Sequence, residues 1–368
     1  MKIAAIELTP YAIPFVQPRD PGTRRLREGL LVALRDTDGL CGYGEIAPLP
    51  GYSPETLSEA REAAETLRSS LLADPIFDTV EKLVQTVTDW FFVHAHPPAV
   101  VFGFETALSD LAARAVGLPL WRWLGGDDGG PVPVNGLLSG DLEQITRQFE
   151  STREYGFTTW KLKVGSLPPR DEVQRVTAVR RLIGPNADLR LDANASWTYA
   201  DAQQILTELR LEHLDYVEEP LRPEERSRLS ELAAATGVQL TLDETVIDFE
   251  EWHGCLSAVG FAVAVFKPTL AGGLFRVWHM ARYRADQNTR VAITSTLETG
   301  IGLAACWHLA VALKRIARIG RVIPCGLATL DLLEQSGIEE ELPIVNGHMS
   351  LPDGPGLGVT PNRELYRG

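Results

Sequence analysis

Apolar and polar residues alternate in the first part of the chain, as they do in strands with one buried face. Residues 2–14 show this alternation, and residues 29–35 and 40–46 repeat it on either side of residues 36–39. The sequence Asp-Thr-Asp-Gly at 36–39 is a hairpin turn signal. These runs predict a small antiparallel sheet.

Two helical patterns follow this sheet. Residues 54–72 are rich in Ala, Glu and Leu, with Ser53 as the expected N-cap and Pro54 at the first helical position. Residues 104–116 form a second helical pattern that ends at Gly117. Together with the strands, these helices predict an N-terminal α+β unit.

A different texture begins after the Gly-rich segment 125–130. Short apolar runs rich in Val, Leu and Ile alternate with longer helical patterns, which is typical of parallel strands covered by helices. Seven or eight such units in a row favour a closed barrel over an open sheet. The runs are residues 132–138, 157–164, 188–193, 214–218, 239–243, 261–267 and 290–294, with residues 321–327 as an eighth.

Composition and charge narrow the class of protein. The net charge of −14 disfavours nonspecific binding to nucleic acid or to an anionic membrane. No apolar run approaches the roughly 18 residues of a membrane helix, and the N-terminus does not resemble a secretory signal peptide. None of the four cysteines forms a Cys-x-x-Cys pair, so we expect neither a zinc ribbon nor a disulfide framework, and a cytoplasmic location.

Ionisable residues stand at the ends of five successive apolar runs. They are Lys163, Asp192, Glu218, Asp243 and Lys267, at intervals of 29, 26, 25 and 24 residues. One βα unit of a barrel of ~250 residues is about that long. We therefore expect the five side chains at one level, at the C-terminal mouth where barrel enzymes place their chemistry.

Three carboxylates on adjacent strands offer oxygen ligands to a hard divalent cation. Asp192, Glu218 and Asp243 would leave the remaining positions around Mg²⁺ to water or substrate oxygens, and Mn²⁺ would suit the same ligands. By composition alone, Glu219 and Glu244 fit this role equally well. Each acid taken singly is more often a helix N-cap or a solvated loop residue, so the prediction rests on the whole pattern.

Lysines flank the three acids. Lys161 and Lys163 lie two apart on one run, so both point the same way. A neighbouring ammonium lowers a lysine pKa from about 10.4 towards neutrality, where the lysine can act as a general base. With a divalent cation that stabilises an enolate, this arrangement suits proton abstraction next to a carboxylate. Glu298 is a weaker candidate, since it also suits the N-terminus of the next helix.

These residues together resemble the enolase superfamily, in its muconate-lactonising branch. The resemblance covers nearly the whole chain and implies an α/β fold, a (β/α)7β TIM-type barrel with an N-terminal α+β capping domain. It places the cap at 1–125, completed by the tail 328–368, and the barrel at 126–327. The motifs are Lys161-Leu162-Lys163, Asp192-Ala193-Asn194, Glu218-Glu219-Pro220, Asp243-Glu244 and Lys267-Pro268.

Within that branch, other segments resemble the o-succinylbenzoate synthase family. Ala328 departs from the usual Asp of that family, which affects local contacts rather than the chemistry. The resemblance implies a lyase that dehydrates 2-succinyl-6-hydroxy-2,4-cyclohexadiene-1-carboxylate to 2-succinylbenzoate in menaquinone or phylloquinone biosynthesis. The segments are residues 44–53, 55–56, 189–198, 267–270 and 326–332.

The same resemblance assigns roles to residues. It implies that Mg²⁺ binds to Asp192, Glu218 and Asp243, with Glu218 preferred as the first acid of Glu-Glu-Pro. Lys163, the second lysine of its motif, would be the base that removes the proton next to the ring carboxylate. Lys267 would stabilise the resulting anion or lie against the ring face.

The remaining contacts to substrate are implied in the same way. The loop 17–28 and residues 48–53 would close the mouth and bind the succinyl group. In that loop, Arg24, Arg25 and Arg27 are expected to contact the succinyl group, and Ser295 and Gly326 to touch the same end of the substrate. Lys161 would add positive charge near the ring carboxylate, and Asn194 is also expected to bind substrate.

Other functions fit part of this pattern. An N-succinylamino acid racemase or a dipeptide epimerase would use the same metal site and two bases, which Lys163 and Lys267 supply. A muconate cycloisomerase is disfavoured by the capping segment, and a noncatalytic binding barrel by the lysines. The expected partner in every catalytic case is a small-molecule carboxylate, and the sequence leaves the oligomeric state open.

Overall fold

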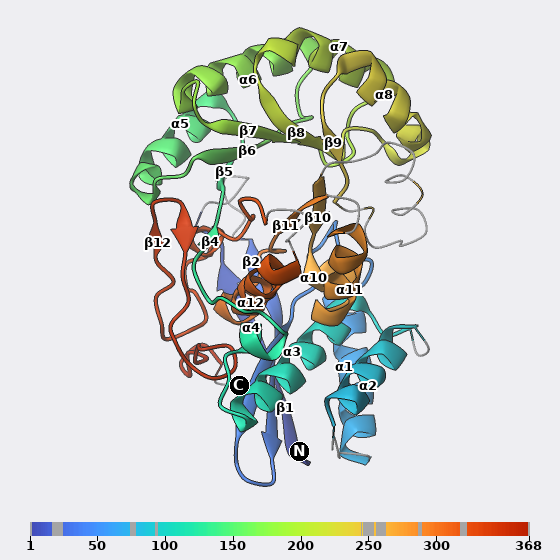
Figure 1. Cartoon of the computed structure of the whole chain (residues 1–368), viewed down its shortest axis with the longest axis vertical. Coiled ribbons are helices and arrows are strands. Elements are labelled where there is room, and N and C mark those ends of the chain that lie inside the picture. Colours follow the sequence, from blue (N-terminus) through green and yellow to red (C-terminus); the bar gives the residue numbers. More distant parts are fainter. Residues whose placement is uncertain are drawn as a thin grey trace.

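An α+β unit and a barrel make up the chain. The barrel helices of residues 142–236 form an arc at the far end from the N-terminal sheet, and those of residues 268–316 lie next to the N-terminal unit (Figure 1). In this computed structural model the described residues are 2–16, 25–73, 79–92, 95–243, 245, 254, 263–285, 289–316 and 322–366. Among these residues, no helix combines the length and the apolar character that a bilayer crossing requires.

The N-terminal sheet is antiparallel, in the order β1-β2-β3, and the predicted hairpin at residues 36–39 is confirmed. The carboxylate of Asp36 accepts from the backbone N–H groups of Asp38 (3.0 Å) and Leu40 (2.9 Å), which fixes the turn. The strands are β1 (Ile3–Pro14), β2 (Leu26–Asp36) and β3 (Cys41–Ile46).

Helices pack on one face of this sheet. A Cβ on Gly44 of β3 would lie 1.9 Å from the backbone oxygen of Gly103, so only glycine permits this approach of sheet and helix. The helices of this unit are α1 (Leu57–Ala73), α2 (Val80–Phe92), α3 (Pro98–Ala115) and the short α4 (Leu120–Trp123), of which α1 and α3 contact the sheet.

The start predicted for the first helix is wrong by three residues. Helix α1 begins at Leu57, and Thr56 rather than Ser53 caps it: the N–H of Glu59 donates to the Thr56 hydroxyl (3.3 Å). The Glu59 carboxylate in turn accepts from the Thr56 N–H (2.8 Å), which completes a capping box. The Ser53 hydroxyl instead accepts from the N–H of Leu49 (2.8 Å) in the preceding turn.

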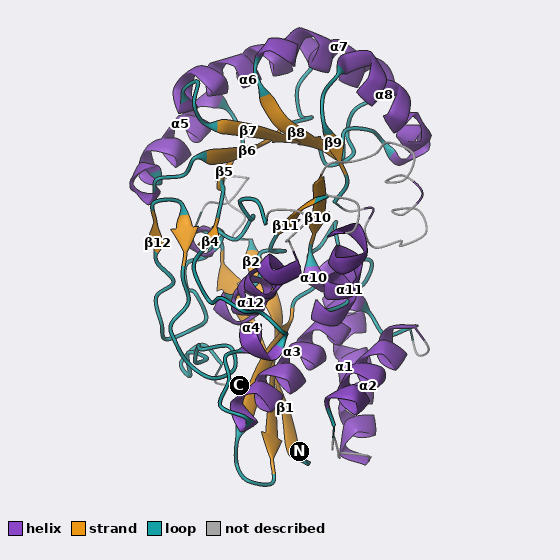
Figure 2. Cartoon of the chain, in the orientation of Figure 1, coloured by secondary structure: helices purple, strands orange, loops and turns teal. Residues whose placement is uncertain are grey.

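Parallel strands form the barrel, and helices cover its outside (Figure 2). The predicted α/β barrel with an N-terminal α+β unit is confirmed. Its parallel strands are β5 (Gly136–Leu138), β6 (Thr159–Lys163), β7 (Asp188–Asp192), β8 (Leu214–Glu218), β9 (Leu240–Thr241), β10 (Val263–Phe266) and β11 (Arg290–Ile293), and the short β4 (Val132–Pro133) precedes them. Its helices are α5 (Leu142–Ser151), α6 (Pro169–Ile183), α7 (Tyr199–Glu208), α8 (Leu229–Thr236), α10 (Pro268–Ala271), α11 (Leu274–Ala285) and α12 (Gly300–Ile316).

The eighth predicted run closes the barrel through single bridges rather than as a regular strand. Val322 pairs with β11, and Cys325 pairs in parallel with Val134, next to the first barrel strand. The backbone of Asn135 donates to the oxygen of Cys325 (3.0 Å). Residue 321 lies outside the described residues.

The C-terminal tail touches both parts of the chain. Its strands β12 (Ile344–Val345) and β13 (His348–Met349) form a sheet with β4 of the barrel. Before them, the N–H of Glu334 donates to the oxygen of Pro14 at the end of β1 (2.9 Å). The tail thus joins the barrel to the N-terminal unit, whereas the sequence led us to expect only the second contact.

Two buried carboxylates of the N-terminal unit accept N–H groups at the starts of barrel helices. Glu45 of β3 accepts from Thr299, just before α12 (2.9 Å). Glu105 of α3 accepts from Leu274 (3.0 Å) and Phe275 (2.6 Å) in α11. Because a helix N-terminus carries partial positive charge, these contacts favour one fixed placement of the cap on the barrel.

Replacement of Glu105 by glutamine is expected to flatten the dependence of the unfolding free energy on pH. Burial raises the pKa of Glu105 from 4.5 to about 8. A carboxyl whose pKa is higher in the folded state gives stability that is complete below the unfolded pKa and is lost as the pH rises through the folded pKa. The wild type should therefore lose stability relative to Glu105→Gln between pH 4.5 and about 8, at up to about 1.4 kcal/mol per pH unit.

Urea unfolding at several pH values measures this difference. The control is Glu62→Gln, at an exposed position of α1, which should keep the wild-type slope. Equal slopes for Glu105→Gln and the wild type would show that the buried carboxyl does not titrate in this interval.

Candidate active site

The strand register supports the prediction that the five ionisable side chains lie at one level of the barrel mouth. Lys163 at the end of β6 pairs with Asp192 at the end of β7, and Asp192 pairs with Glu218 at the end of β8. Asp243 follows β9 by two residues, and Lys267 follows β10 directly. Adjacent parallel strands thereby bring all five side chains to the C-terminal mouth.

Three of these side chains form a buried carboxylate cluster. Asp192, Glu218 and Asp243 have no solvent exposure, and one oxygen of each lies within 4.8 Å of the others. The Oε2 atom of Glu218 and the Oδ1 atom of Asp243 have no hydrogen-bond donor among the described residues. Buried acceptors of this kind are costly unless a cation or a donor satisfies them. The residues therefore fit a divalent metal ion.

Lysine ammonium groups contact the cluster from two ends. Lys163 donates to Oδ2 of Asp192 (2.6 Å), and Lys267 donates to Oδ2 of Asp243. Lys161 lies between, with its Nζ 2.6 Å from Oε1 of Glu218 and 2.8 Å from Oδ2 of Asp192. The two outer lysines therefore approach the metal site from different carboxylates.

The electrostatics of Lys161 differ from our expectation. Burial lowers the pKa of this lysine, but the carboxylates of Asp192, Glu218 and Asp243 raise it well above its usual value. The expected effect of one ammonium on another is therefore outweighed at this position. Burial in turn raises the pKa of Asp192, but Lys161, Lys163 and Lys267 together hold it well below its usual range.

Glu219 has a supporting role, which separates it from Glu218. Its backbone leaves the strand with a φ of 40°, and its Oε1 accepts from the N–H groups of Asp243 (3.0 Å) and Thr245 (2.8 Å). Glu219 thus fixes the backbone of a neighbouring acid instead of joining the cluster. Glu244, the other alternative, lies outside the described residues.

Asn194 connects the lysine of β6 with the acid of β7. Its Oδ1 accepts from Nζ of Lys163 (2.9 Å), and its N–H donates to Oδ1 of Asp192 (3.1 Å). A φ of 43° brings the residue back towards the strand end. Asn194 therefore orients the ammonium group of Lys163.

Comparison with known proteins decides the family. A family model described as "Enolase C-terminal domain-like" matches residues 144–365, and one described as "MenC, N-terminal domain" matches residues 11–111. The chain belongs to the enolase superfamily, in its muconate-lactonising subgroup. The buried cluster of Asp192, Glu218 and Asp243 is typical of the divalent metal site of that superfamily.

Individual relatives span most of the chain. An o-succinylbenzoate synthase of Thermosynechococcus vestitus is 30% identical over 81% of this chain and 86% of its own length. A hydrophobic dipeptide epimerase of Enterococcus faecalis is 26% identical over 92% and 93%. A solved muconate lactonizing enzyme from Pseudomonas fluorescens has a TM-score of 0.87 at 22% identity, over 99% of this chain and 97% of that one. This last likeness concerns the enolase-like fold.

Ser295 and Gly326 lie side by side at the mouth of this enolase-superfamily barrel. The N–H of Ser295 donates to the oxygen of Gly326 (3.0 Å), and its hydroxyl shares a hydrogen bond with Thr329 (2.8 Å). Their contact with substrate remains a prediction.

Arg27 does not have the role that we expected. Its side chain is 1% exposed and donates to backbone oxygens on both sides of the contact between the cap and the barrel. It therefore joins the two parts and is not available to bind a succinyl group. Arg25 is exposed, and Arg24 lies outside the described residues. The oxygens that Arg27 contacts are those of Ala47 (2.5 Å), Pro48 (2.9 Å), Thr296 (3.2 Å) and Leu297 (2.7 Å).

Glu298 is also structural. It is fully buried, accepts from the hydroxyl of Thr269 and from the N–H of Thr296 (2.6 Å), and its burial raises its pKa. These contacts tie the loop after β11 to α10. Glu298 therefore supports the loops at the mouth.

Tyr52 brings the cap to the site. It lies on the loop between β3 and α1, and its ring centre is 5.5 Å from Nζ of Lys267. This contact agrees with the expectation that residues 48–53 cover the mouth.

Replacement of Tyr52 by leucine is expected to lower kcat/KM about 2- to 30-fold. A cation–π contact contributes about 0.5 to 2 kcal/mol, and its loss removes one of the contacts that orient the ammonium group of Lys267. Steady-state kinetics measure the effect, with Tyr52→Phe as the control because phenylalanine keeps the ring. Equal losses in both variants would contradict the contact.

Proposed function

We propose that this protein is an o-succinylbenzoate synthase that uses Mg²⁺. Its substrate would be 2-succinyl-6-hydroxy-2,4-cyclohexadiene-1-carboxylate and its product 2-succinylbenzoate, in the cytoplasmic biosynthesis of menaquinone. The observation that carries the proposal is the match of residues 11–111 to the MenC N-terminal domain, because this capping segment distinguishes enzymes that share the barrel site. The synthase relative supports the same assignment.

The residues divide into a metal site and a proton-transfer group. Asp192, Glu218 and Asp243 would hold Mg²⁺ through carboxylate oxygens, with the substrate carboxylate as a further oxygen ligand. When bound, the cation supplies Lewis-acid stabilisation of negative charge on that carboxylate. Lys267, at the Asp243 end, adds positive charge next to the same anion.

Lys163 would carry the proton in both halves of the dehydration. Its neutral amine removes the hydrogen next to the ring carboxylate, and the C–H electron pair becomes part of the new ring double bond. The C–O bond to the 6-hydroxyl then breaks, and the ammonium group of Lys163 returns its proton to that oxygen. Water leaves, and the ring becomes aromatic. Asn194 Oδ1, 2.9 Å from Nζ, keeps the group directed during both transfers.

A second function is favoured by the position of Lys267. Its ammonium group and that of Lys163 contact different carboxylates of the cluster, Asp243 and Asp192. Two such groups, on opposite faces of one carbon, are what an N-succinylamino acid racemase or a dipeptide epimerase needs. The relative named as a hydrophobic dipeptide epimerase supports this alternative.

Parallel assays with both substrate classes test the proposal. Dehydration of the cyclohexadiene carboxylate is followed by its ultraviolet change, and exchange of the α-proton of N-succinylamino acids and dipeptides is followed in D₂O. We expect kcat/KM to be largest for dehydration. A higher kcat/KM for epimerisation would make the racemase or epimerase activity the main function and contradict the synthase proposal.

A further inference from the structure

A buried ion pair on α6 lies behind the turn that follows β6. Glu172 has no solvent exposure and Arg175 has 6%. The Nε atom of Arg175 donates to Oε1 of Glu172 (2.9 Å), and a second guanidinium nitrogen contacts the same oxygen. Burial of such a pair is costly unless further hydrogen bonds satisfy both groups, so the other contacts of the pair are informative.

Those contacts go to the backbone around Lys163. Arg175 donates to the oxygen of Lys163 (3.3 Å), and Oε2 of Glu172 accepts from the N–H of Gly165 (2.7 Å). Between them, the N–H of Val164 donates to the oxygen of Asp192 on β7 (2.9 Å). The backbone of each residue from 163 to 165 therefore has at least one hydrogen bond that fixes its place.

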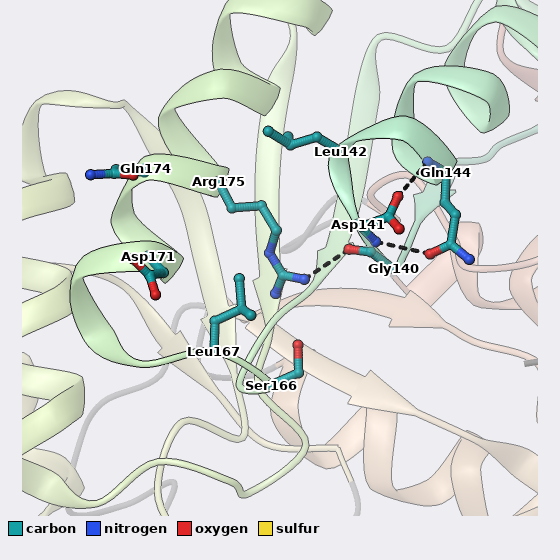
Figure 3. Close-up of a pocket in the computed structure, with 9 residues that line it drawn as sticks. All are labelled: Gly140, Asp141, Leu142, Gln144, Ser166, Leu167, Asp171, Gln174 and Arg175. Carbon is teal, nitrogen blue, oxygen red and sulfur yellow. Dashed lines mark hydrogen bonds between the residues drawn. The ribbon is translucent and has the colours of Figure 1, made fainter. Parts of the chain in front are cut away.

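The same arginine reaches the neighbouring turn. It donates to the oxygen of Gly140, between β5 and α5 (2.8 Å), as the dashed line in Figure 3 shows. Around this contact, the two turns and the helix starts line an open hollow of about 450 Å³. None of the predicted site residues lines it. Arg175 therefore lies between this hollow and the site.

We propose that Arg175, held by Glu172, is a positioning residue for Lys163, a role that rests on the proposed function of that lysine as the base. The amine of Lys163 stands at the end of four methylene groups, so a small tilt of its backbone moves Nζ relative to substrate. A misplacement of about 1 Å can lower a rate about 100-fold. The planar guanidinium holds the turns of β5 and β6 at once, which a lysine ammonium at position 175 would not reproduce.

The variants are Arg175→Ala, Arg175→Lys and Glu172→Gln. Arg181→Ala is the matched control, because Arg181 is exposed on the same helix. We expect kcat to fall about 10- to 100-fold in Arg175→Ala while KM changes less than about threefold, since no group that binds substrate or metal is touched.

Added guanidinium ion, which can enter through the hollow, should restore part of the kcat of Arg175→Ala. The kcat of Arg175→Lys should stay below that of the wild type. If Arg175→Ala does not fold, Glu172→Gln decides, with the same direction of change in kcat.

A second measurement does not depend on the reaction. Hydrogen exchange of the amides of Val164 and Gly165 should be at least about 10-fold faster in Arg175→Ala than in Arg181→Ala, because their hydrogen bonds become part of a less stable local structure. Mn²⁺ binding should be the same in both variants. A kcat equal to that of the control, or unchanged exchange, would overturn the proposal.

The two proposals can fail separately. If the wild type does not dehydrate the cyclohexadiene carboxylate, the proposed function is wrong, and hydrogen exchange still decides the role of Arg175. Faster hydrogen exchange in Arg175→Ala then supports the positioning role of Arg175, whichever substrate loses its proton to Lys163. Unchanged exchange rejects that role.

Discussion

Replacement of Lys163 by alanine is expected to lower kcat for dehydration at least about 100-fold, since a positioned general base contributes about 10² to 10⁴. The lysine is the only proton carrier in the proposed reaction, and it delivers the proton to the leaving oxygen as well. The acids of the cluster are untouched, so Mn²⁺ should still bind. Stopped-flow absorbance gives the rate, and calorimetric titration gives the metal affinity.

Lys163→Arg is the matched control for this result. Arginine keeps a positive charge near Asp192 and Asn194, but with a pKa above about 12 it does not act as a base near neutral pH. The arginine variant should therefore be as inactive as the alanine variant. Turnover above one tenth of the wild type in either variant would mean that another group removes the proton.

Glu218→Gln is expected to weaken Mn²⁺ binding by more than about 100-fold, because changes to outer partners of a metal site already cost about 10- to 100-fold. Glu218 is fully buried in the carboxylate cluster, and its Oε2 has no donor among the described residues. The amide removes a negative charge from the site and places an N–H₂ group next to the cation. Metal-dependent activity should be lost in parallel, and electron paramagnetic resonance of Mn²⁺ measures the binding.

The adjacent glutamate provides the control. Glu219→Gln should keep Mn²⁺ affinity within about 10-fold and instead lower the free energy of unfolding by about 1–3 kcal/mol, the cost of disturbing a buried acceptor. Its carboxylate accepts two backbone N–H groups and does not join the cluster. Loss of metal binding in Glu219→Gln to the same degree as in Glu218→Gln would show that the ligand assignment is wrong.

Regular spacing made the centre of the site predictable from sequence. A parallel barrel repeats one βα unit, so residues at equal intervals share a level, and the register of Lys163, Asp192 and Glu218 follows. The choice between Glu218 and Glu219 did not follow from composition. Side chains alternate along β8, so Glu218 lies on the same face as Tyr216, which packs with the two valines of β10, and this is the signal that favours Glu218.

Contacts between distant parts of the chain were not predictable in this way. Arg27 contacts a loop 270 residues away in sequence, and Glu105 caps a helix 169 residues away. Neither partner is visible in a local pattern. The sequence therefore predicts a substrate contact for Arg27 and no role for Glu105. Glu172 and Arg175 were missed for the same reason, since a charged pair at i and i+3 usually marks an exposed helix face.

Helix α2 shows a local miss. Leu83, Val87 and Trp90 are buried at helical spacing, and this amphipathic pattern is a local signal for the helix. The eighth barrel run shows the opposite case. Its apolar residues predict a strand, but Pro324 has no backbone N–H and interrupts the ladder of hydrogen bonds.

Turnover of 2-succinyl-6-hydroxy-2,4-cyclohexadiene-1-carboxylate by the purified protein tests the central claim most directly. The assay follows the ultraviolet change on aromatisation with Mg²⁺, and again with excess chelator. We predict rapid conversion to 2-succinylbenzoate with the metal and none after chelation. Absence of conversion by protein that binds the metal would contradict the account of this site as a synthase.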